Sequence, residues 1–146
     1  MTSGKGRVSA ALRERVSRQA GYRCGYCLSS QELMGIPMTI EHLVPEILGG
    51  ATVEENLWLS CIRCNLFKGA QTHAKDPHTG ECVALFDPRR DVWTEHLCWD
   101  EQGVEIKGIT ARGRATCAAL RMNNPEITVA RRLWVVAGWW PPRARD

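Results

Sequence analysis

The chain has 146 residues, of which 44% are hydrophobic and 24% are charged, and it carries a formal net charge of +3. This composition is typical of a globular protein and excludes a disordered chain, and the length suits a single core. No run of about 18 apolar residues could span a bilayer, and the first residues lack the apolar stretch of a signal peptide. We therefore expect one domain over residues 1–146, located in the cytoplasm and with no membrane partner.

The first half of the chain predicts two helices that flank a pair of strands. Ser9 is a favourable helix cap, apolar residues follow it at helical spacing, and Gly21 is a typical stop signal. Two short segments have the character of strands, with Gly49-Gly50 as a turn signal between them. The predicted elements are a helix over 9–20, strands over 38–42 and 57–60, and a helix over 62–69.

The second half predicts a C-terminal extension over residues 81–146. Two dipeptides, Asp76-Pro77 and Thr79-Gly80, are turn signals, so residues 72–80 are expected to form an ordered loop. Most of the tryptophans are expected to pack in a core rather than to stack on bases. The predicted elements are a strand over 81–86, a hairpin of strands 95–99 and 104–107, and helices over 110–122 and 125–137.

Two Cys-x-x-Cys pairs indicate a metal site. Cys24 and Cys27 form the first pair, and Cys61 and Cys64 form the second after 33 intervening residues. Four thiolates in two knuckles are the ligand set of a tetrahedral structural zinc ion. Disulfides, a redox dithiol and an iron–sulfur cluster are the alternatives, and a reducing cytosol disfavours disulfides. The remaining cysteines are expected to be buried free thiols: Cys82, Cys98 and Cys117.

The stretch between and after these pairs resembles the motif of the HNH endonucleases. The resemblance covers residues 24–69, which we take as the motif core. It implies an α+β fold: a ββα-metal core with a structural zinc knuckle, an N-terminal helix, and a C-terminal β-hairpin with two helices. The matching strings are IEHLVP at 40–45, GG at 49–50, ENL at 55–57 and CIRCNLFKG at 61–69.

The resemblance also implies a role for individual motif residues. His42 corresponds to the general base, a task that suits an imidazole because it titrates near neutrality. Asn56 corresponds to the residue that orients the base. Glu41 and Asn65 correspond to the protein ligands of a catalytic metal, Asn65 standing where the motif has its last histidine. Oxygen ligands favour Mg²⁺ or Mn²⁺ over a second zinc ion.

The distribution of charge is compatible with a nucleic-acid substrate. Residues 1–23 hold six Lys/Arg against one Glu, residues 24–111 hold six against thirteen Asp/Glu, and residues 112–146 hold seven against two acidic residues. Basic ends around an acidic centre are compatible with arginine side chains that contact phosphates on either side of the site. Basic helix faces that contact only solvent are an equally good interpretation. Arg63 and Lys68 are further candidates for phosphate contacts.

Together these features predict a metal-dependent endonuclease that nicks or cleaves DNA, with duplex DNA as the expected partner and weak sequence preference. The resemblance implies products with a 5′ phosphate and a 3′ hydroxyl. The protein is expected to be a monomer or a homodimer. A zinc-dependent nucleic-acid-binding module without turnover is the alternative, because Glu41 and Asn65 make a sparse ligand set for a catalytic metal.

Overall fold

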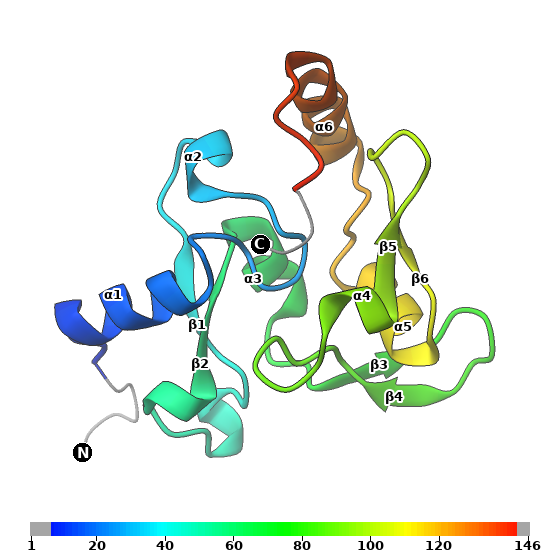
Figure 1. The fold of residues 1–146 in the computed structure, drawn as a ribbon. Helices are drawn as coiled ribbons and strands as arrows, with labels where there is room; N and C mark the ends of the chain where they lie inside the picture. Colours follow the sequence, from blue (N-terminus) through cyan, green and yellow to red (C-terminus); the bar gives the residue numbers. More distant parts are fainter. Residues whose placement is uncertain (1–6, 143–146) are drawn as a thin grey trace. The chain divides into compact units, whose positions relative to one another are not determined.

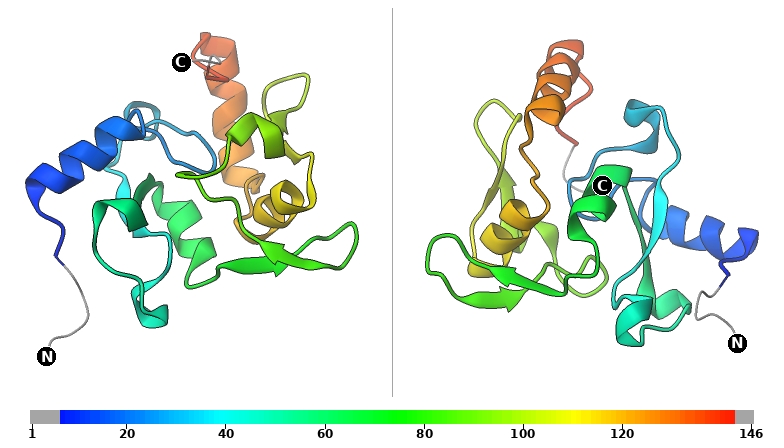
Figure 2. Two further views of the ribbon diagram at one scale, coloured as in Figure 1. Left: turned by 60° about the horizontal axis from the view of Figure 1, so that its bottom comes forward. Right: turned by 180° about the vertical axis from the view of Figure 1, so that it is seen from behind.

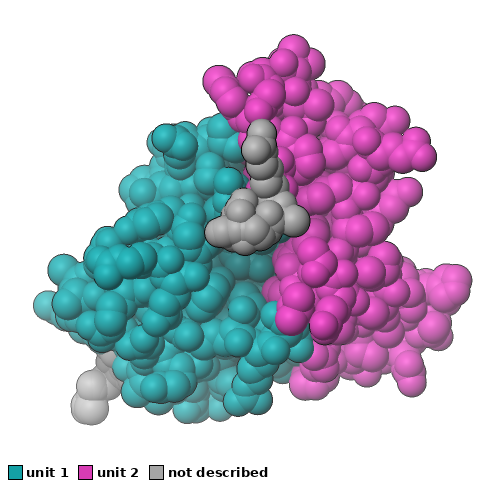
Figure 3. Space-filling view, viewed as in Figure 1, with its two compact units in different colours: residues 1–72, 87–91 teal, residues 73–86, 92–146 magenta. Residues whose placement is uncertain are grey.

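A computed structural model describes residues 7–142, which form two compact units (Figure 3). Unit 1 comprises the described residues up to Thr72 together with Asp87–Asp91, and unit 2 comprises His73–Phe86 with the described residues from Val92 onward. Both units combine helices with short antiparallel strands, which confirms the predicted α+β class. Within residues 7–142, every helix is too short or too polar to cross a bilayer.

Unit 1 is built around the predicted strand pair. The strands are antiparallel, with Thr39 opposite Ser60 and His42 opposite Leu57. One helix, α1, lies on one side of the pair, and another, α3, lies on the other side (Figures 1 and 2). The elements of unit 1 are α1 (Ala10–Gln19), α2 (Gln31–Met34), β1 (Thr39–His42), the 3₁₀ helices η1 (Glu46–Leu48) and η2 (Glu54–Asn56), β2 (Leu57–Ser60) and α3 (Ile62–Lys68). The four elements predicted for the first half are thus confirmed.

Local sequence signals explain where these elements begin and which face they bury. Ser9 caps α1 by accepting a 3.1 Å hydrogen bond from the Leu12 amide, as its position predicts. In β2, Leu57 and Leu59 are fully buried. α1, which buries Val16, packs against this strand. Because successive strand residues point to opposite faces, β2 presents one apolar face to the core of unit 1.

Unit 2 holds the C-terminal extension. Its strands form two antiparallel pairs, β3 with β4 and β5 with β6. The predicted loop over 72–80 is wrong for its first part, because residues 73–75 form β3. The predicted strand over 95–99 is also partly wrong, because residues 95 and 96 end a helix. The elements are β3 (His73–Lys75), β4 (Cys82–Ala84), α4 (Trp93–His96), β5 (Leu97–Trp99), β6 (Ile106–Gly108), α5 (Ala111–Ala119) and α6 (Pro125–Ala137).

A buried ion pair fixes the turn between β3 and β4. Asp76 is fully buried, and its carboxylate accepts two hydrogen bonds, of 3.0 and 2.9 Å, from the guanidinium of Arg114 in α5. These bonds hold the pKa of the Asp76 carboxyl well below its usual range. The same carboxylate accepts bonds from the His78 amide and the Thr79 hydroxyl. The turn signals at these positions therefore belong to a hairpin held by a residue far along the sequence.

Aromatic packing closes the core of unit 2. Arg131 of α6 is fully buried, and its guanidinium lies 5.5 Å from the centre of the Trp99 ring. The expectation that the tryptophans pack is confirmed for this cluster, whereas Trp139 is 63% exposed. Ring centroids 5.0 to 5.5 Å apart link four tryptophans in succession: Trp93, Trp99, Trp140 and Trp134.

Gly113 in α5 offers a test of this packing. A Cβ atom at this position would lie 1.8 Å from the carbonyl oxygen of His96, so the backbones approach too closely for any side chain. We expect Gly113→Ala to lower the free energy of unfolding of unit 2 by about 1–3 kcal/mol, the usual cost of overpacking. Urea unfolding followed by tryptophan fluorescence measures it, since five of the six tryptophans lie in unit 2. The exposed control Ala118→Ser should change stability by less than about 0.5 kcal/mol, and equal effects would contradict the packing argument.

Candidate active site

The four paired cysteines converge in unit 1. All four are buried, and their sulfur atoms lie within 4.8 Å of one another. The sulfurs of Cys27 and Cys61 are 3.8 Å apart. A zinc ion bonded to four sulfurs at about 2.3 Å would hold each pair of sulfurs about 3.8 Å apart, because the edge of a tetrahedron is about 1.6 times the centre-to-corner distance. The cluster therefore fits a zinc site, and with four thiolates the site would be structural.

The backbone around the first pair explains how the knuckle forms. The amide of Gly25 donates a 2.9 Å hydrogen bond to the carbonyl of Leu59, which ties the knuckle to β2. A Cβ at Gly25 would lie 2.3 Å from the Trp58 ring, so only glycine fits there. Within this coupled cluster, hydrogen bonds from the other three thiols, first of all Cys24, lower the pKa of the Cys27 thiol, whereas burial raises the pKa of the Cys24 thiol. A lowered pKa favours the thiolate that binds metal.

The second pair begins α3. Cys61 is the cap residue of this helix, and its sulfur accepts a hydrogen bond from the Cys64 amide. The cluster therefore ties the start of α3 to the knuckle. The other cysteines differ from expectation: two lie on short two-stranded sheets, which leave much of each strand uncovered, and Cys117 lies on the partly covered helix α5. Cys82 is exposed, and Cys98 and Cys117 are half-buried.

Glu41 is directed into the interior of unit 1. Its side chain is 3% exposed, and its Oε2 accepts a hydrogen bond from the Tyr26 hydroxyl and lies 3.2 Å from Lys68 Nζ. Burial raises the pKa of this carboxyl, and the positive charge of Lys68 and the Tyr26 hydrogen bond act against that rise. Oε1 is buried and makes no hydrogen bond of ordinary geometry, but the nearby Ser60 hydroxyl still lowers the pKa of this carboxyl. The carboxylate is thus buried and already neutralised by the Lys68 ammonium, a lining that does not by itself fit a divalent cation.

His42, the next residue, has a different set of partners. Its Nε2 lies 2.8 Å from Thr52 Oγ1, and the Thr52 hydroxyl lies 3.5 Å from Glu46 Oε2. The distance from His42 Nε2 to the same Glu46 oxygen is 3.9 Å. Thr52 and Glu46 belong to the segment between β1 and β2, and the imidazole is partly exposed, at 16%. Thr52 therefore fixes Nε2 of His42, while the imidazole stays partly accessible to solvent.

Asn56 crosslinks the segment that follows His42. Its Oδ1 accepts a 2.8 Å bond from the Val44 amide, and its Nδ2 donates to the carbonyls of Val44 and Ala51 at 3.0 and 2.9 Å. Gly50 lies inside this crosslink, where a Cβ would be 1.7 Å from the Val44 carbonyl oxygen. The segment from residue 44 to residue 51 is thus closed on itself by one amide side chain.

Three further candidate residues lie on α3. Lys68 follows Asn65 by three positions, so the two are neighbours on one side of the helix, and Asn65 is half-buried. Lys68 is 4% exposed, and its amine contacts Glu41 and, at 3.5 Å, the Leu43 carbonyl. Lys68 therefore connects α3 to Glu41 of β1. Arg63 is half-buried in the first turn, between the two cysteines of the second pair.

The structure thus forms two groups around neighbouring residues of β1. Glu41 contacts Lys68 and Tyr26, and His42 lies beside Thr52 and Glu46. Adjacent strand residues point to opposite faces, which is why Glu41 and His42 have separate partners. Sequence reasoning missed Tyr26, Thr52 and Glu46. Tyr26 lies inside the knuckle, and the other two lie in a segment with no regular period. No local pattern distinguishes their side chains from ordinary loop residues.

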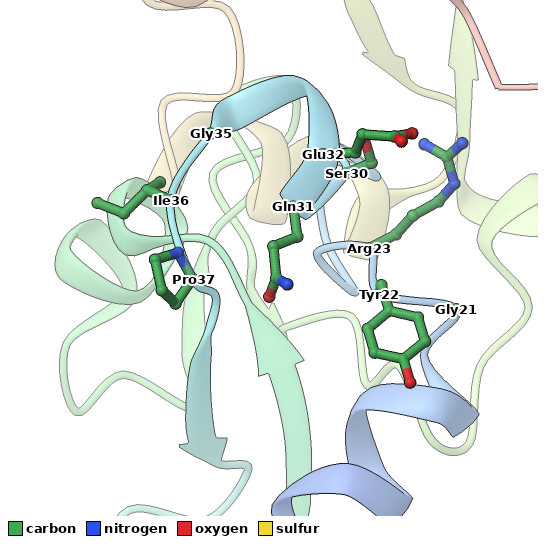
Figure 4. Close-up of a pocket in the computed structure, with 9 residues that line it drawn as sticks. All are labelled: Gly21, Tyr22, Arg23, Ser30, Gln31, Glu32, Gly35, Ile36 and Pro37. Atoms are coloured by element: carbon green, nitrogen blue, oxygen red, sulfur yellow. The ribbon is translucent and has the colours of Figure 1, made fainter.

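A cavity of about 650 Å³ opens elsewhere in unit 1 (Figure 4). It lies beside α2 and the end of α1, with Tyr22, Arg23 and Glu32 among its lining residues. Pro37, also in its lining, precedes the first residue of β1, whereas His42 is the last residue of that strand. The cavity is therefore distinct from the His42 group.

Removal of one cysteine tests the zinc site. We expect Cys61→Ser to lose the bound zinc, because three thiolates and a hydroxyl hold the ion less tightly. Unit 1 should also lose stability, since a structural zinc contributes on the order of 10 kcal/mol. Metal content by atomic emission, together with thermal unfolding, measures both effects. Cys82→Ser is the matched control and should keep zinc and stability; a Cys61→Ser protein with full zinc content would rule the site out.

Comparison with known proteins places this geometry in a family. The model of the HNH endonuclease family matches residues 24–71, about a third of the chain, a range that begins at the first zinc-cluster cysteine and ends just beyond α3. No curated protein and no solved structure matches the chain. The matched segment contains both cysteine pairs, both strands and α3, in the order that the sequence motif indicates. Residues 24–71 therefore form a domain of the HNH endonuclease family.

Proposed function

We propose that the protein is a metal-dependent endonuclease that hydrolyses phosphodiester bonds in DNA, with His42 as the general base. The observation that carries this proposal is the hydrogen-bond contact between His42 and Thr52, which holds one ring nitrogen and leaves the imidazole partly exposed within a domain of a nuclease family. Hydrolysis requires a water molecule that loses a proton as it attacks phosphorus, and a fixed neutral imidazole is suited to accept that proton.

The contacts of His42 assign its tautomer. If the Thr52 hydroxyl donates to the Glu46 carboxylate, its oxygen accepts from Nε2–H of His42. The proton then resides on Nε2, and Nδ1 carries the lone pair that takes the proton from water. Asn56 supports this arrangement indirectly, because its crosslink fixes the segment that carries Thr52.

The chain also provides oxygen atoms for a divalent metal. By correspondence with the family motif, Glu41 and the amide oxygen of Asn65 would hold Mg²⁺ or Mn²⁺, which requires the Lys68 ammonium to leave the Glu41 carboxylate. When bound, the metal would stabilise negative charge on the phosphate and on the leaving 3′ oxygen. The protein itself orients the base, closes the segment beside it and holds α3 through the cysteine cluster.

Exposed cations supply candidate contacts to the DNA backbone. Arg15 and Arg18 of α1 are exposed but pair with Glu54 and Glu14, so only part of their charge is available to a phosphate. In unit 2, Arg132 on α6 is exposed. Backbone contacts of this kind carry no sequence information, so we expect weak sequence preference on duplex DNA and cleavage that weakens as salt rises.

Substitution of His42 is the primary test. We expect His42→Ala to reduce nicking of supercoiled plasmid in Mg²⁺ or Mn²⁺ by at least about 100-fold, the usual contribution of a general base. Zinc content and circular dichroism should not change, because the partly exposed ring is not part of the core. The assay is run at two salt concentrations so that binding and cleavage are separated.

A matched histidine gives the control. His78 is exposed in unit 2, and His78→Ala should nick at the wild-type rate. If the wild-type protein binds plasmid but cuts with neither metal, the protein is a binding module without turnover, and the proposed function is wrong. If His42→Ala keeps its rate, cleavage occurs but the assignment of the base is wrong.

Thr52 tests the orientation of the base. Thr52→Val keeps the shape of the side chain but removes the hydroxyl, so the ring loses a hydrogen bond worth about 1 kcal/mol and its fixed tautomer. We expect the turnover number to fall about tenfold with little change in KM for DNA, and Thr52→Ser to restore most of the rate. A fall in DNA affinity with unchanged turnover would show that Thr52 contacts substrate instead.

A further inference from the structure

The segment between β1 and β2 exposes apolar side chains close to His42. Ile47 is 82% exposed and Leu48 is 58% exposed, and Val44 and Val53 are each a little less than half exposed. The segment extends beyond the ends of both strands (Figures 1 and 2). Single exposed apolar side chains are ordinary, but several in one short segment mark an interaction site.

The shape of this segment does not depend on its exposed side chains. Asn56 closes the segment through bonds to Val44 and Ala51, and the amides of Leu48 and Gly49 donate to backbone carbonyls. None of these bonds uses the two most exposed side chains. The segment therefore holds two bulky apolar groups in water for a reason other than its own closure.

The same segment carries the contacts of His42. Glu46 Oε2 lies 3.9 Å from His42 Nε2 and 3.5 Å from the Thr52 hydroxyl, and Ile47 is the next residue. Consecutive Cα atoms are about 3.8 Å apart, so residue 47 lies within about four base steps of the imidazole, at about 3.4 Å a step. A nucleic acid whose phosphate reaches His42 is therefore within reach of Ile47 and Leu48.

The charges of the segment favour a contact with bases over a contact with phosphates. Glu46 is the one charged residue in positions 44–53, and two further glutamates follow at 54 and 55. The segment thus has no cation to hold a phosphate, and its carboxylates repel one. Apolar side chains bind DNA in another way, because isoleucine and leucine can enter the minor groove and insert between two base pairs.

We propose that Ile47 and Leu48 form an apolar wedge that partly unstacks a base step of duplex DNA beside the phosphate at His42. This inference rests on the proposed function, because it takes DNA as the substrate and His42 as the base. Pyrimidine–purine steps unstack most easily, so the wedge directs cleavage toward TA and CA/TG steps without reading base edges.

Duplex binding by the zinc-loaded His42→Ala protein tests the wedge, because this variant leaves the DNA uncut. Adding Ile47→Ser and Leu48→Ser should weaken binding at least about tenfold, since the apolar area buried on DNA is lost. The slope of log Kd against log salt should not change, because no phosphate contact is removed. Leu133→Ser with Val136→Ser, an equally exposed pair on α6, is the matched control and should bind within about twofold of the parent.

Relaxation of a closed circular plasmid measures unstacking directly. Topoisomerase treatment in the presence of the His42→Ala protein should leave the plasmid with a lower linking number, because an inserted side chain untwists the duplex. The pair of serine substitutions should remove most of this shift. Ile47→Lys should also weaken binding, whereas a tip that contacts phosphates would bind more tightly with the added charge.

Several outcomes would overturn the inference. Unchanged affinity and linking number in the serine pair would assign the apolar segment to another partner, such as a basic protein, and would leave the proposed function standing. Weaker binding with a salt slope reduced by about one would show a phosphate contact instead. If the pair loses zinc, each single substitution reports in its place. A wild type that nicks with neither metal contradicts the proposed function, yet binding and relaxation still decide whether the wedge exists.

Discussion

The convergence of two cysteine pairs is the constraint on which the candidate site depends. The cluster joins a knuckle after α1 to the first turn of α3, and a hydrogen bond from Gly25 joins the same knuckle to β2. With both ends tied, the side of α3 that carries Lys68 is held against Glu41 of β1. A helix of seven residues would be marginal on its own, so a zinc ion held by the four cysteines would supply what intrinsic helix stability does not.

Glu41 and His42, the last two residues of β1, have different surroundings. Glu41 points inward, where burial makes its charge depend on Lys68 and Tyr26. His42 points toward the segment before β2, where the Thr52 hydroxyl lies 2.8 Å from one ring nitrogen and itself contacts the Glu46 carboxylate. A pleated strand places neighbouring side chains on opposite faces, so Glu41 and His42 have separate partners without direct competition between them.

Much of unit 1 was predictable because its signals are local. The Ser9 cap, the alternation in the strands and the cysteine spacing each act within a few residues, and each predicted element forms. In unit 2, β3 was not predictable, because its turn depends on a bond from Arg114 to Asp76, 38 residues away. At the site, the motif indicated which residues to consider, but not that Lys68 would be buried on Glu41, which depends on packing across the fold. The chain length led us to expect a single domain. The described residues form two compact units, and the single domain stays a prediction.

The most direct measurement is a crystal structure of the zinc-loaded protein with Mn²⁺ and an uncleaved DNA duplex, with anomalous scattering used to identify each metal. The account predicts zinc among the four cysteine sulfurs, Mn²⁺ bound by Glu41 and Asn65, and a phosphate facing His42 Nδ1. Manganese bound away from Glu41, or a phosphate out of reach of His42, would contradict it.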